Sequence, residues 1–423
     1  MGQKTNRNIV IITNSYPFGK GEEFFEKELD YLVSAFHKVI IISRHTSNEQ
    51  TRSVPNTVKI FRTNIKTNYW DIFFAWKYIF DKRFWSEIKN IYSIIKIKIT
   101  FKIIVELVHS LFYGDALEKS MSNIIDEYDL KTNELYLYSY WSTFGAYAIA
   151  KYKSDNPEAV AVARAHGHDL YWERRQSQYI PLRYFLLKYL DKIFFISNHG
   201  KKYFQDKLKC LDSEKLCVSR LGINNHCLLT ERSRDAEFII VSCSGLISIK
   251  RIDLIIKTLA KIKNYKVYWV HIGDGELMGN IKELARELLY NKPNIKYDFK
   301  GHINNNEVFE FYNDHSVDVL LNVSKDEGVP VSIMEACSFK IPIIATDVGG
   351  ISEIVNEKNG VLLPANPSED EIADAISSIQ KLSDAEKDGK KLNAYNTWKT
   401  KYNAEVNYLN FIEQILNIKT TKK

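Results

Sequence analysis

The chain has 423 residues, and 45% of them are apolar, which is enough to fill the cores of two domains of ordinary size. Its formal net charge of +6 is small, so charge alone does not indicate a general nucleic-acid-binding protein. The five cysteines lack the paired spacing of a zinc site or a disulfide framework, and we expect reduced thiols in a cytoplasm and no metal: Cys210, Cys217, Cys227, Cys243 and Cys337.

The N-terminal apolar run, Ile9–Ile12, is too short for the hydrophobic part of a secretory signal. No window of the chain reaches the roughly 18–20 uninterrupted apolar residues that a membrane-spanning helix needs. The sequence therefore predicts a protein that is soluble or bound at a membrane surface.

Apolar, β-branched runs alternate with helix-compatible stretches along the chain. The first run, Ile9–Thr13, has the continuous apolar pattern of a buried parallel strand, and a helix is predicted next at Glu22–Phe36. Further strands are predicted at Val39–Ser43, Leu135–Tyr138, Val160–Ala165, Lys192–Ile196, Phe238–Cys243, Val267–Ile272, Val317–Val323 and Pro342–Thr346. This alternation predicts an α/β fold of doubly wound parallel sheets.

The segment Trp76–Lys102 interrupts the alternation. It contains seven lysines and arginines against two acids, Asp81 and Glu87, so its net charge is +5, and aromatic residues and isoleucines lie between the charges. This composition is typical of an amphipathic helix that lies on anionic lipid. An ordinary surface helix with a basic face would look similar, but we expect association with a membrane surface.

A polar stretch, Thr230–Glu237, divides the chain near its middle, and the strand alternation restarts after it. We therefore predict an N-terminal domain at residues 1–229 and a C-terminal domain at residues 237–394. Residues 395–420 have a helical pattern with no strand after them.

Parallel α/β sheets bind ligands at the carboxyl ends of their strands, so the residues that follow each strand are the candidates for a site. The run Val317–Val323 leads to a glycine turn and then to a predicted helix, through Gly328, Val329, Pro330 and Val331. The free N–H groups of such a helix start attract phosphate. Glu335, about one turn into the helix, can accept two hydrogen bonds from a ribose diol, and Glu327, before the turn, can accept one from another sugar hydroxyl. A pair of solvent-exposed acids would have the same spacing.

Other strand ends in the C-terminal half also carry candidates. Gly245 follows one strand, and Lys250 and Arg251 fall at the start of the next helix, where a cation opposes the helix dipole unless an anion such as a diphosphate lies between them. A solvated lysine–arginine pair is the alternative. Gly273 and Ile303 follow two further strands, and their turns let a ligand approach the backbone closely.

In the N-terminal half, Gly19 and Gly21 form a glycine loop after the first strand. The loop lacks the G-K-[ST] ending of a P-loop, so we reject ATP hydrolysis by that route. His166 follows the strand Val160–Ala165, where a neutral imidazole can donate to a phosphate or a reacting oxygen. A histidine that packs or caps is the alternative.

Together these residues resemble the E-x7-E signature of the retaining GT-B glycosyltransferases of family 4. The motif reads Ser324-x-x-Glu327-Gly328-x-Pro330, Glu335-Ala336, Pro342–Thr346 and Gly349-Gly350-x-x-Glu353. The resemblance covers nearly the whole chain, is specific in the C-terminal half and looser in the N-terminal half, and is nearest to bacterial enzymes that build capsule, exopolysaccharide or O-antigen.

The resemblance implies a GT-B fold, in which two Rossmann-like domains enclose a nucleotide-sugar cleft and the last helix crosses back to the N-terminal domain. By the same resemblance, Glu335 would hold the ribose, Glu327 the transferred sugar and Lys250 the diphosphate, with His166 near the sugar and the β-phosphate. The other donor contacts it implies are at Gly19, Gly21, Gly245, Arg251, Gly273, Ile303, Gly328, Val329, Pro330 and Val331.

The implied reaction moves a sugar, with retention of configuration, from a nucleoside diphosphate sugar to a glycan acceptor on a polyprenyl lipid at the inner leaflet. It needs no cofactor, no metal and no nucleic acid. Two departures stand out: Gly245 lies where many members have an arginine, and Lys340 where they often have a glycine. A GT-B-fold nucleotide-sugar 2-epimerase and a non-catalytic nucleotide-sugar-binding subunit are the alternatives.

Overall fold

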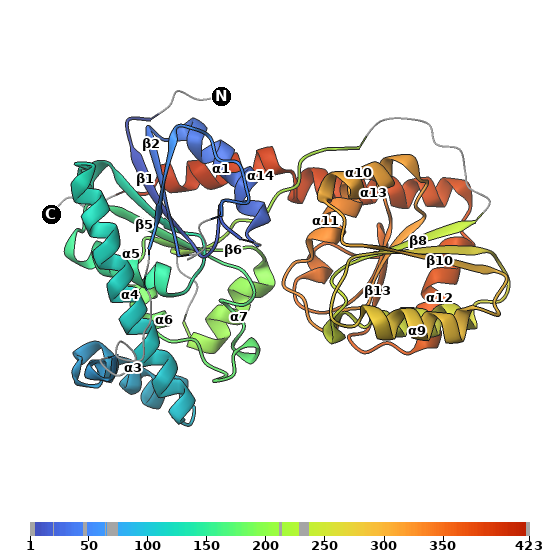
Figure 1. Ribbon diagram of the computed structural model, residues 1–423, viewed down its shortest axis with the longest axis horizontal. Coiled ribbons are helices and arrows are strands. Elements are labelled where there is room, and N and C mark those ends of the chain that lie inside the picture. The colour runs from blue at the N-terminus through green and yellow to red at the C-terminus, as the bar shows by residue number, and fades with distance from the viewer. Residues whose placement is uncertain are drawn as a thin grey trace. The chain divides into compact units, whose positions relative to one another are not determined.

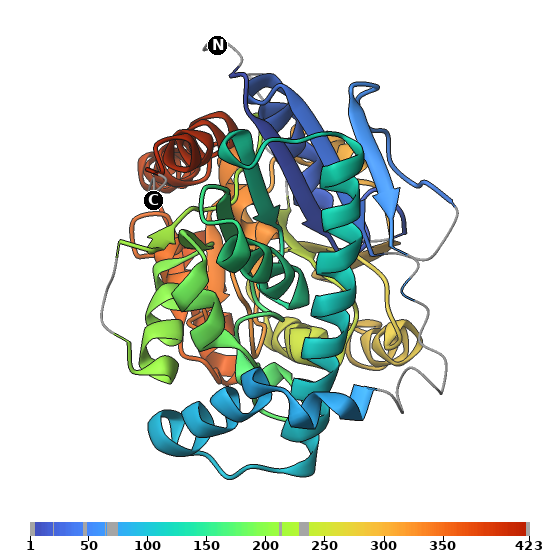
Figure 2. The same ribbon diagram turned by 90° about the vertical axis from the view of Figure 1, so that its left-hand side faces the viewer.

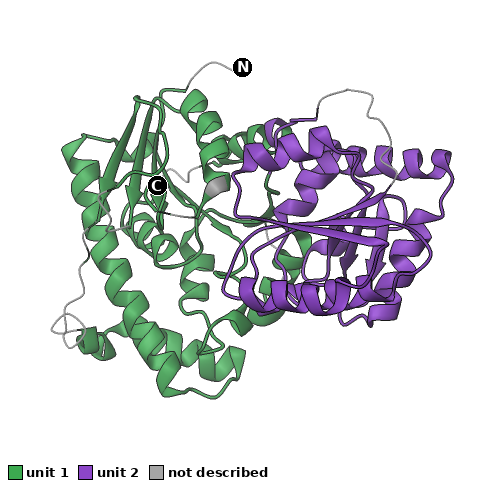
Figure 3. Ribbon diagram, turned by 45° about the vertical axis from the view of Figure 1, so that its right-hand side comes forward, with its two compact units in different colours: residues 1–221, 406–423 green, residues 222–405 purple. Residues whose placement is uncertain are grey.

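The computed structural model of the chain describes residues 5–19, 21–44, 49–63, 65, 75–210, 214–227 and 237–419. The chain forms two compact units, unit 1 with residues 1–221 and 406–423 and unit 2 with residues 222–405 (Figure 3). The sequence placed the domain limits at residues 229, 237 and 394. The polar stretch Thr230–Glu237 that suggested the first of these limits lies, except for its last residue, outside the described residues.

Unit 1 is built on a seven-stranded sheet in the order β3-β2-β1-β4-β5-β6-β7. Every neighbouring pair in this sheet is parallel. The strands are β1 (Asn8–Thr13), β2 (Lys38–Ser43), β3 (Val58–Arg62), β4 (Leu135–Ser139), β5 (Val160–Ala165), β6 (Lys192–Phe195) and β7 (Leu216–Val218). The parallel pairing confirms the fold class that the β-branched runs predict.

Helices cover both faces of this sheet, which explains why its strands are apolar at consecutive positions. Val10 and Ile12 belong to the core under α4 and α5, whereas Ile9 and Ile11 belong to the core under α1 and α14. Figure 2 shows the long helix α4 running across its face of the sheet. The helices are α1 (Glu23–Ala35), α3 (Lys82–Asn90), α4 (Phe101–Glu127), α5 (Phe144–Asp155), α6 (Arg183–Tyr189), α7 (Asn198–Leu208) and α14 (Ala404–Leu416).

The end of the chain forms two helices where the sequence suggested one at residues 395–420. The first, α13 (Asp384–Lys401), belongs to unit 2, and most of α14 belongs to unit 1. On α14, Phe411, Ile412 and Ile415 are buried in the same core as Ile9 and Ile11. Helix α14 therefore completes the core of the first unit.

A fully buried ion pair lies in this part of unit 1. The guanidinium of Arg164 on β5 donates to the Oε2 atom of Glu28 on α1 at 2.6 Å, and both side chains have 0% exposure. The Tyr138 hydroxyl donates to Oε1 of the same carboxylate at 2.8 Å, and the Arg164 guanidinium lies 4.1 Å from the ring centroid of Phe411 on α14. Burial raises the pKa of Glu28, and the charge of Arg164 opposes that rise.

Unit 2 repeats the doubly wound plan with a six-stranded parallel sheet in the order β10-β9-β8-β11-β12-β13 (Figure 1). Its strands are β8 (Phe238–Cys243), β9 (Val267–Ile272), β10 (Ile295–Gly301), β11 (Val319–Asn322), β12 (Ile343–Thr346) and β13 (Gly360–Leu363). Its helices are α8 (Ile252–Lys261), α9 (Met278–Leu289), α10 (Asn305–Asp314), α11 (Val331–Ser338), α12 (Glu369–Gln380) and α13.

The basic segment Trp76–Lys102 is broken into several pieces, so the single amphipathic helix that its composition suggests is wrong. A 3-10 turn covers Trp76–Phe80, and α3 begins where the carboxylate of Asp81 accepts a hydrogen bond from the backbone N–H of Arg83 at 2.7 Å. A π-helical turn at Ile91–Ile95 follows α3 and ends at Lys96, whose backbone is left-handed with φ 59°. Among the helices of the described residues, none combines the length and the apolar character needed to cross a membrane.

Candidate functional site

The glutamate before the turn contacts the predicted phosphate lysine directly. Lys250, at the end of a 3-10 turn after β8, donates from Nζ to Oε1 of Glu327 at 2.5 Å. Asn322, the last residue of β11, donates to the same oxygen at 3.4 Å. Glu327 is only 9% exposed, and these two donors orient its carboxylate. The structure thus brings together two residues that lie 77 positions apart in the sequence.

The loop that carries Glu327 is fixed from several sides. The Thr346 hydroxyl donates to the carbonyl of Ser324 at 2.6 Å, and the N–H of Lys325 donates to the carbonyl of Ile249 at 2.8 Å. The N–H of Gly350 donates to the carbonyl of Gly328 at 2.7 Å. These bonds come from three different segments of unit 2, so the position of Glu327 is set by the fold of the whole unit.

Gly349 has a special place beside this loop. Its φ is 57°, and a Cβ atom added there would lie 1.9 Å from the carbonyl oxygen of Glu327. Only glycine fits both the left-handed backbone and this close approach. The Gly349-Gly350 pair therefore supports the Glu327 loop.

We expect the substitution Gly349→Ala to lower turnover by about 100-fold, because relief of the overlap must shift the backbone of Glu327 on the ångström scale. The matched control is Gly389→Ala on α13, where an added Cβ meets nothing within 4 Å. Equal steady-state rates for the two variants would contradict the supporting role of Gly349.

Arg251 lies at the start of α8, but its side chain is bound to the protein itself. Its Nε donates to the Val323 carbonyl at 2.6 Å, Nη2 donates to the carbonyls of Ser324 at 3.1 Å and Ala365 at 2.9 Å, and Nη1 donates to Oδ1 of Asn366 at 3.2 Å. These bonds use four of the five N–H donors of a guanidinium. Arg251 therefore supports the Glu327 loop. Its contact with a diphosphate stays a prediction, and only one N–H donor of the guanidinium remains for it.

Glu335 is buried on α11, at 6% exposure, and its Oε1 accepts a hydrogen bond from Asn305 at the start of α10 at 3.2 Å. Asn305 follows Ile303 by two residues, so the β10–α10 turn lies beside this carboxylate. Gly273 has φ 140° and its N–H donates to the Gly301 carbonyl at 2.9 Å, which joins the ends of β9 and β10. The sequence did not single out Asn305 or Asn322 as partners of the two glutamates.

Gly245, another predicted contact of the sugar donor, follows β8. A Cβ atom added to Gly245 would lie 3.6 Å from its nearest neighbour, the carbonyl oxygen of Asp274. This is an ordinary contact, so the backbone at position 245 has room for a side chain. Pro330 immediately precedes α11, which begins at Val331, as the sequence predicts. Gly328 and Val329 form the turn before it.

His166 belongs to unit 1, where it lies at the carboxyl end of β5 between two aromatic rings. The ring centroids of Tyr140 and Trp141 are each 4.6 Å from that of the imidazole. Neither ring nitrogen has a hydrogen-bond partner among the described residues, although Nδ1 lies 3.9 Å from Oδ2 of Asp169. The imidazole is therefore packed between aromatic rings, and its two buried nitrogens keep their hydrogen-bonding capacity unused within the described residues.

Asp169 is a supporting residue of this second group. Its Oδ1 accepts the backbone N–H of His166 at 2.8 Å, and its Oδ2 accepts that of Ser142 at 2.7 Å. Burial alone would raise the pKa of Asp169, but the nearby His166 side chain and the backbone N–H groups of Ser142 and His166 hold that pKa below its ordinary value.

The glycine loop after β1 contains Gly19 with φ 67° and Gly21 with φ 107°. The carboxylate of the next residue, Glu22, accepts the backbone N–H groups of Asn14 at 2.8 Å, Ser15 at 2.6 Å and Tyr16 at 2.5 Å. A carboxylate of the chain thus occupies the cluster of N–H groups at the end of β1. This role was not predicted, because Glu22 has the pattern of the first residue of an ordinary helix.

Residues 230–396 match the family described as glycosyl transferases group 1. The O-antigen biosynthesis glycosyltransferase WbnH of Escherichia coli is 28% identical over 202 residues, which cover 45% of this chain and 55% of that protein. The putative colanic acid biosynthesis glycosyltransferase WcaL of Salmonella typhimurium is 26% identical over 218 residues, 48% of this chain and 51% of that protein. The chain thus spans about half the length of the curated relatives it matches.

Solved structures resemble the chain over nearly its whole length. A glycosyltransferase from Rickettsia africae has a TM-score of 0.66 at 17% identity and covers 98% of this chain and 100% of its own. HepE of Anabaena in complex with UDP has a TM-score of 0.65 at 13% identity, with 97% and 99% covered. At these identities the likeness shows the fold, which is the GT-B fold of two Rossmann-like units with parallel sheets.

Proposed function

We propose that the protein is a retaining, family 4-like glycosyltransferase that moves a sugar from a nucleoside diphosphate sugar to a hydroxyl of a glycan acceptor in surface-polysaccharide biosynthesis. The observation that carries this proposal is the contact of Lys250 with Glu327 beside the N-terminus of α11. The match of residues 230–396 to group 1 glycosyl transferases and the relatives that build O-antigen and colanic acid support it.

The chemistry follows from the charges in this site. Departure of the nucleoside diphosphate leaves positive charge on the sugar and negative charge on the phosphate. Lys250 and the N–H groups at the start of α11 stabilise the leaving diphosphate, so the reaction needs no metal in this proposal. Glu327 accepts hydrogen bonds from the transferred sugar, and Glu335 accepts them from the ribose.

The proposed transfer retains the anomeric configuration because the acceptor hydroxyl attacks from the side that the diphosphate leaves. The bond from the anomeric carbon to the phosphate oxygen breaks, the bond to the acceptor oxygen forms, and the departing phosphate takes the acceptor proton. His166 donates to the sugar or to the β-phosphate in this scheme.

A thermal-shift screen of nucleotide sugars tests the donor, since a ligand at 100 times its dissociation constant adds roughly 2.7 kcal/mol of stability. Incubation of the identified donor with and without a glycan acceptor then tests the reaction. Transfer with retained configuration in the product NMR spectrum supports the proposal, whereas rapid isomerisation of the donor alone would establish the 2-epimerase alternative. WbnH and WcaL are both described as glycosyltransferases, WcaL as a putative one, and so they give that alternative no support.

We expect Glu335→Ala to weaken the binding of the free nucleoside diphosphate at least tenfold, because a charged acceptor contributes roughly 1.5–3 kcal/mol to a hydrogen bond. Isothermal titration measures this change. The control is Glu310→Ala, which removes an exposed carboxylate from α10. Unchanged affinity in Glu335→Ala would remove the ribose contact from the proposal.

The same proposal places the protein in the cytoplasm, on the inner face of the membrane, through the segment Trp76–Lys102. Within that segment Phe80 is 90% and Tyr92 is 78% exposed, although both are large apolar residues. Exposed aromatic side chains between lysines bind the interface of an anionic bilayer.

We expect the protein to float with liposomes that contain anionic lipid and to stay in the soluble fraction with neutral ones. The double substitution Phe80→Ser with Tyr92→Ser should abolish flotation. The matched control is Tyr290→Ser, which removes an equally exposed ring from unit 2. Equal recovery in the soluble fraction with both kinds of liposome would rule out this surface.

A further inference from the structure

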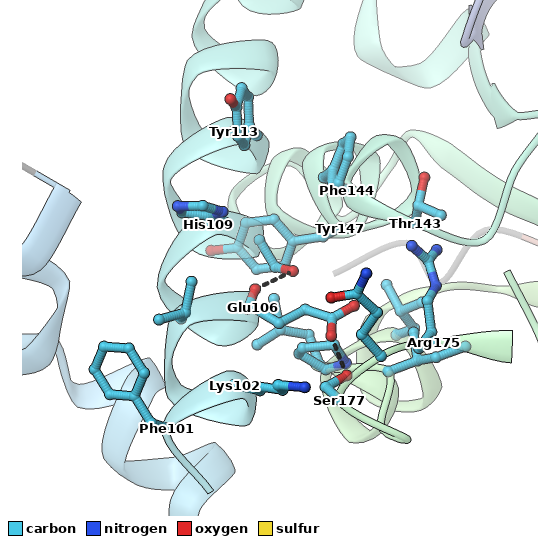
Figure 4. Close-up of a pocket in the computed structure, with 17 residues that line it drawn as sticks. Phe101, Lys102, Glu106, His109, Tyr113, Thr143, Phe144, Tyr147, Arg175 and Ser177 are labelled. Atoms are coloured by element: carbon cyan, nitrogen blue, oxygen red, sulfur yellow. Dashed lines mark hydrogen bonds between the residues drawn. The ribbon is translucent and has the colours of Figure 1, made fainter. Parts of the chain in front are cut away.

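Unit 1 contains a pocket of about 510 Å³ that none of the predicted site residues lines. This volume falls within the range of small-molecule sites. Its walls come from α4, from the start of α5 and from the segment that leads into α6 (Figure 4). The apolar and aromatic part of the lining is Phe101, Val105, Tyr113, Phe144, Tyr147, Ile180, Pro181, Leu182 and Leu186.

Two cations lie in this largely apolar lining, Lys102 on α4 and Arg175 on the facing segment. Among the described residues neither forms an ion pair, and the buried Nε of Arg175 has no hydrogen-bond partner. Glu106, the acid in the lining, accepts a hydrogen bond from the Ser177 hydroxyl (Figure 4). A buried donor without a partner is costly, so the pocket is suited to a ligand that brings an acceptor to Arg175.

The helix α5 adds to the positive character of the same pocket. Thr143 and Phe144, at its N-terminus, both line the pocket. The Thr143 side chain makes no capping hydrogen bond, so the N–H groups of the first turn lack that partner. A helix N-terminus without a side-chain cap, beside two cations, favours a phosphate.

The pocket is continuous with the exposed apolar surface of the basic segment. Phe101 lines the pocket, is 69% exposed and stacks on Trp76 with ring centroids 6.1 Å apart. Of the ten exposed large hydrophobic residues in the described part of the chain, five lie between positions 76 and 102. An apolar chain that leaves the pocket past Phe101 therefore meets a surface suited to a membrane.

We propose that this pocket binds the phosphate end and the first apolar units of an isoprenoid-linked acceptor. The phosphate lies against Arg175, Lys102 and the N-terminus of α5, and the isoprenoid chain follows Val105 and Phe101 toward the membrane. This inference rests on the proposed function and assigns to its acceptor a place and a chemical class, an amphipathic isoprenoid phosphate or diphosphate.

The test measures binding to the full chain with geranylgeranyl diphosphate as the probe, by isothermal titration below the critical micelle concentration. Geranylgeraniol, which lacks the phosphate, and inorganic diphosphate, which lacks the chain, are expected to bind at least tenfold more weakly. Arg175→Gln removes a cation from the pocket, and Val105→Trp fills part of it. Each variant should lower the affinity for the probe at least tenfold and leave the affinity for UDP unchanged. The matched control is Lys119→Gln, which removes an exposed cation from α4 outside the pocket.

Equal affinity of the wild-type protein for the probe and for either partial ligand would overturn the proposal, as would unchanged probe binding in both pocket variants. Failure of the proposed function looks different. A protein that transfers no sugar from any donor, yet binds the probe in an Arg175-dependent way, retains the pocket and loses the transferase. A protein that transfers sugar to a lipid-free glycan but does not bind the probe retains the transferase and loses the pocket.

Discussion

The variant Glu327→Gln will have a kcat at least 100-fold below that of the wild-type protein, with an intact fold and an unchanged affinity for the nucleoside diphosphate. Glutamine keeps the size of the side chain but removes the negative charge that faces Nζ of Lys250 at 2.5 Å. In the proposed reaction this charge acts on the sugar as it becomes positive, so its loss raises the barrier more than it weakens substrate binding. Removal of one fixed electrostatic contact of this kind costs about 10²–10³ in rate.

Steady-state kinetics with the donor found by the thermal-shift screen measures this effect as a fall in kcat at nearly constant KM. The matched control is Glu287→Gln, which makes the same chemical change at an exposed position of α9. Normal turnover of Glu327→Gln would show that the carboxylate holds the loop and takes no part in the reaction. A loss of secondary structure in its circular dichroism spectrum would assign the lost activity to misfolding.

The second large effect is expected for Arg164→Leu, which should destabilise unit 1 by about 3–5 kcal/mol. The substitution leaves the Glu28 carboxylate in a fully buried place without its cation, and it removes the guanidinium from the Phe411 ring. Hydrogen exchange of the β5 and α1 peptides measures the change, and the peptides of unit 2 serve as an internal reference. The two units are separate compact bodies, so a single global unfolding curve would mix them.

The double variant Arg164→Leu with Glu28→Leu distinguishes the two causes of this loss. If the cost comes from the unpaired charge, the double variant recovers much of the stability, because two apolar side chains replace a buried ion pair with little net effect. If the double variant is no more stable than Arg164→Leu, the cost comes from packing and from the Tyr138 hydroxyl. Unchanged exchange of β5 in the single variant would contradict the prediction altogether.

Much of the fold could be predicted because its strands are buried on both faces. A strand such as β1 or β9 is then mostly apolar at consecutive positions, and this pattern can be recognised in the sequence. β3, with the sequence VKIFR, lies at the edge of the sheet and contains two charged residues among five, and β7 has only three residues. Neither gives a continuous run, so neither was predicted.

The candidate site divides in the same way. Glu327, Glu335 and Lys250 were predicted because a strand end, a glycine turn and a helix start follow each other closely in the sequence. Asn305, the partner of Glu335, lies 30 positions before it, and only the fold brings the two side chains together. Asn322 lies five positions before Glu327 within the predicted strand, where nothing in the sequence marks it as a partner. A local signal existed for the break in the basic segment, because Asp81 before Lys82-Arg83 is a good helix cap.

Arg251 and Glu22 illustrate a different limit. A charged residue at a strand end or a helix start is a reasonable candidate for a ligand contact, but the chain itself has carbonyl and N–H groups in the same place. Arg251 binds three carbonyls of its own unit, and Glu22 binds three backbone N–H groups. Whether a charged side chain binds the protein itself or a ligand depends on the conformation of the loop. That conformation cannot be predicted from the local sequence.

The contribution of α14 to the core of unit 1 has a consequence for synthesis. Phe411, Ile412 and Ile415 leave the ribosome after the whole of unit 2, whereas Ile9 and Ile11 leave it before unit 2. Unit 2 is continuous in sequence and can fold as soon as its residues emerge. The part of this sheet face that α14 covers therefore stays exposed in the nascent chain until α14 emerges, although α1 is already present on the same face. A polysome making this protein will carry chains in which unit 1 is completed after unit 2.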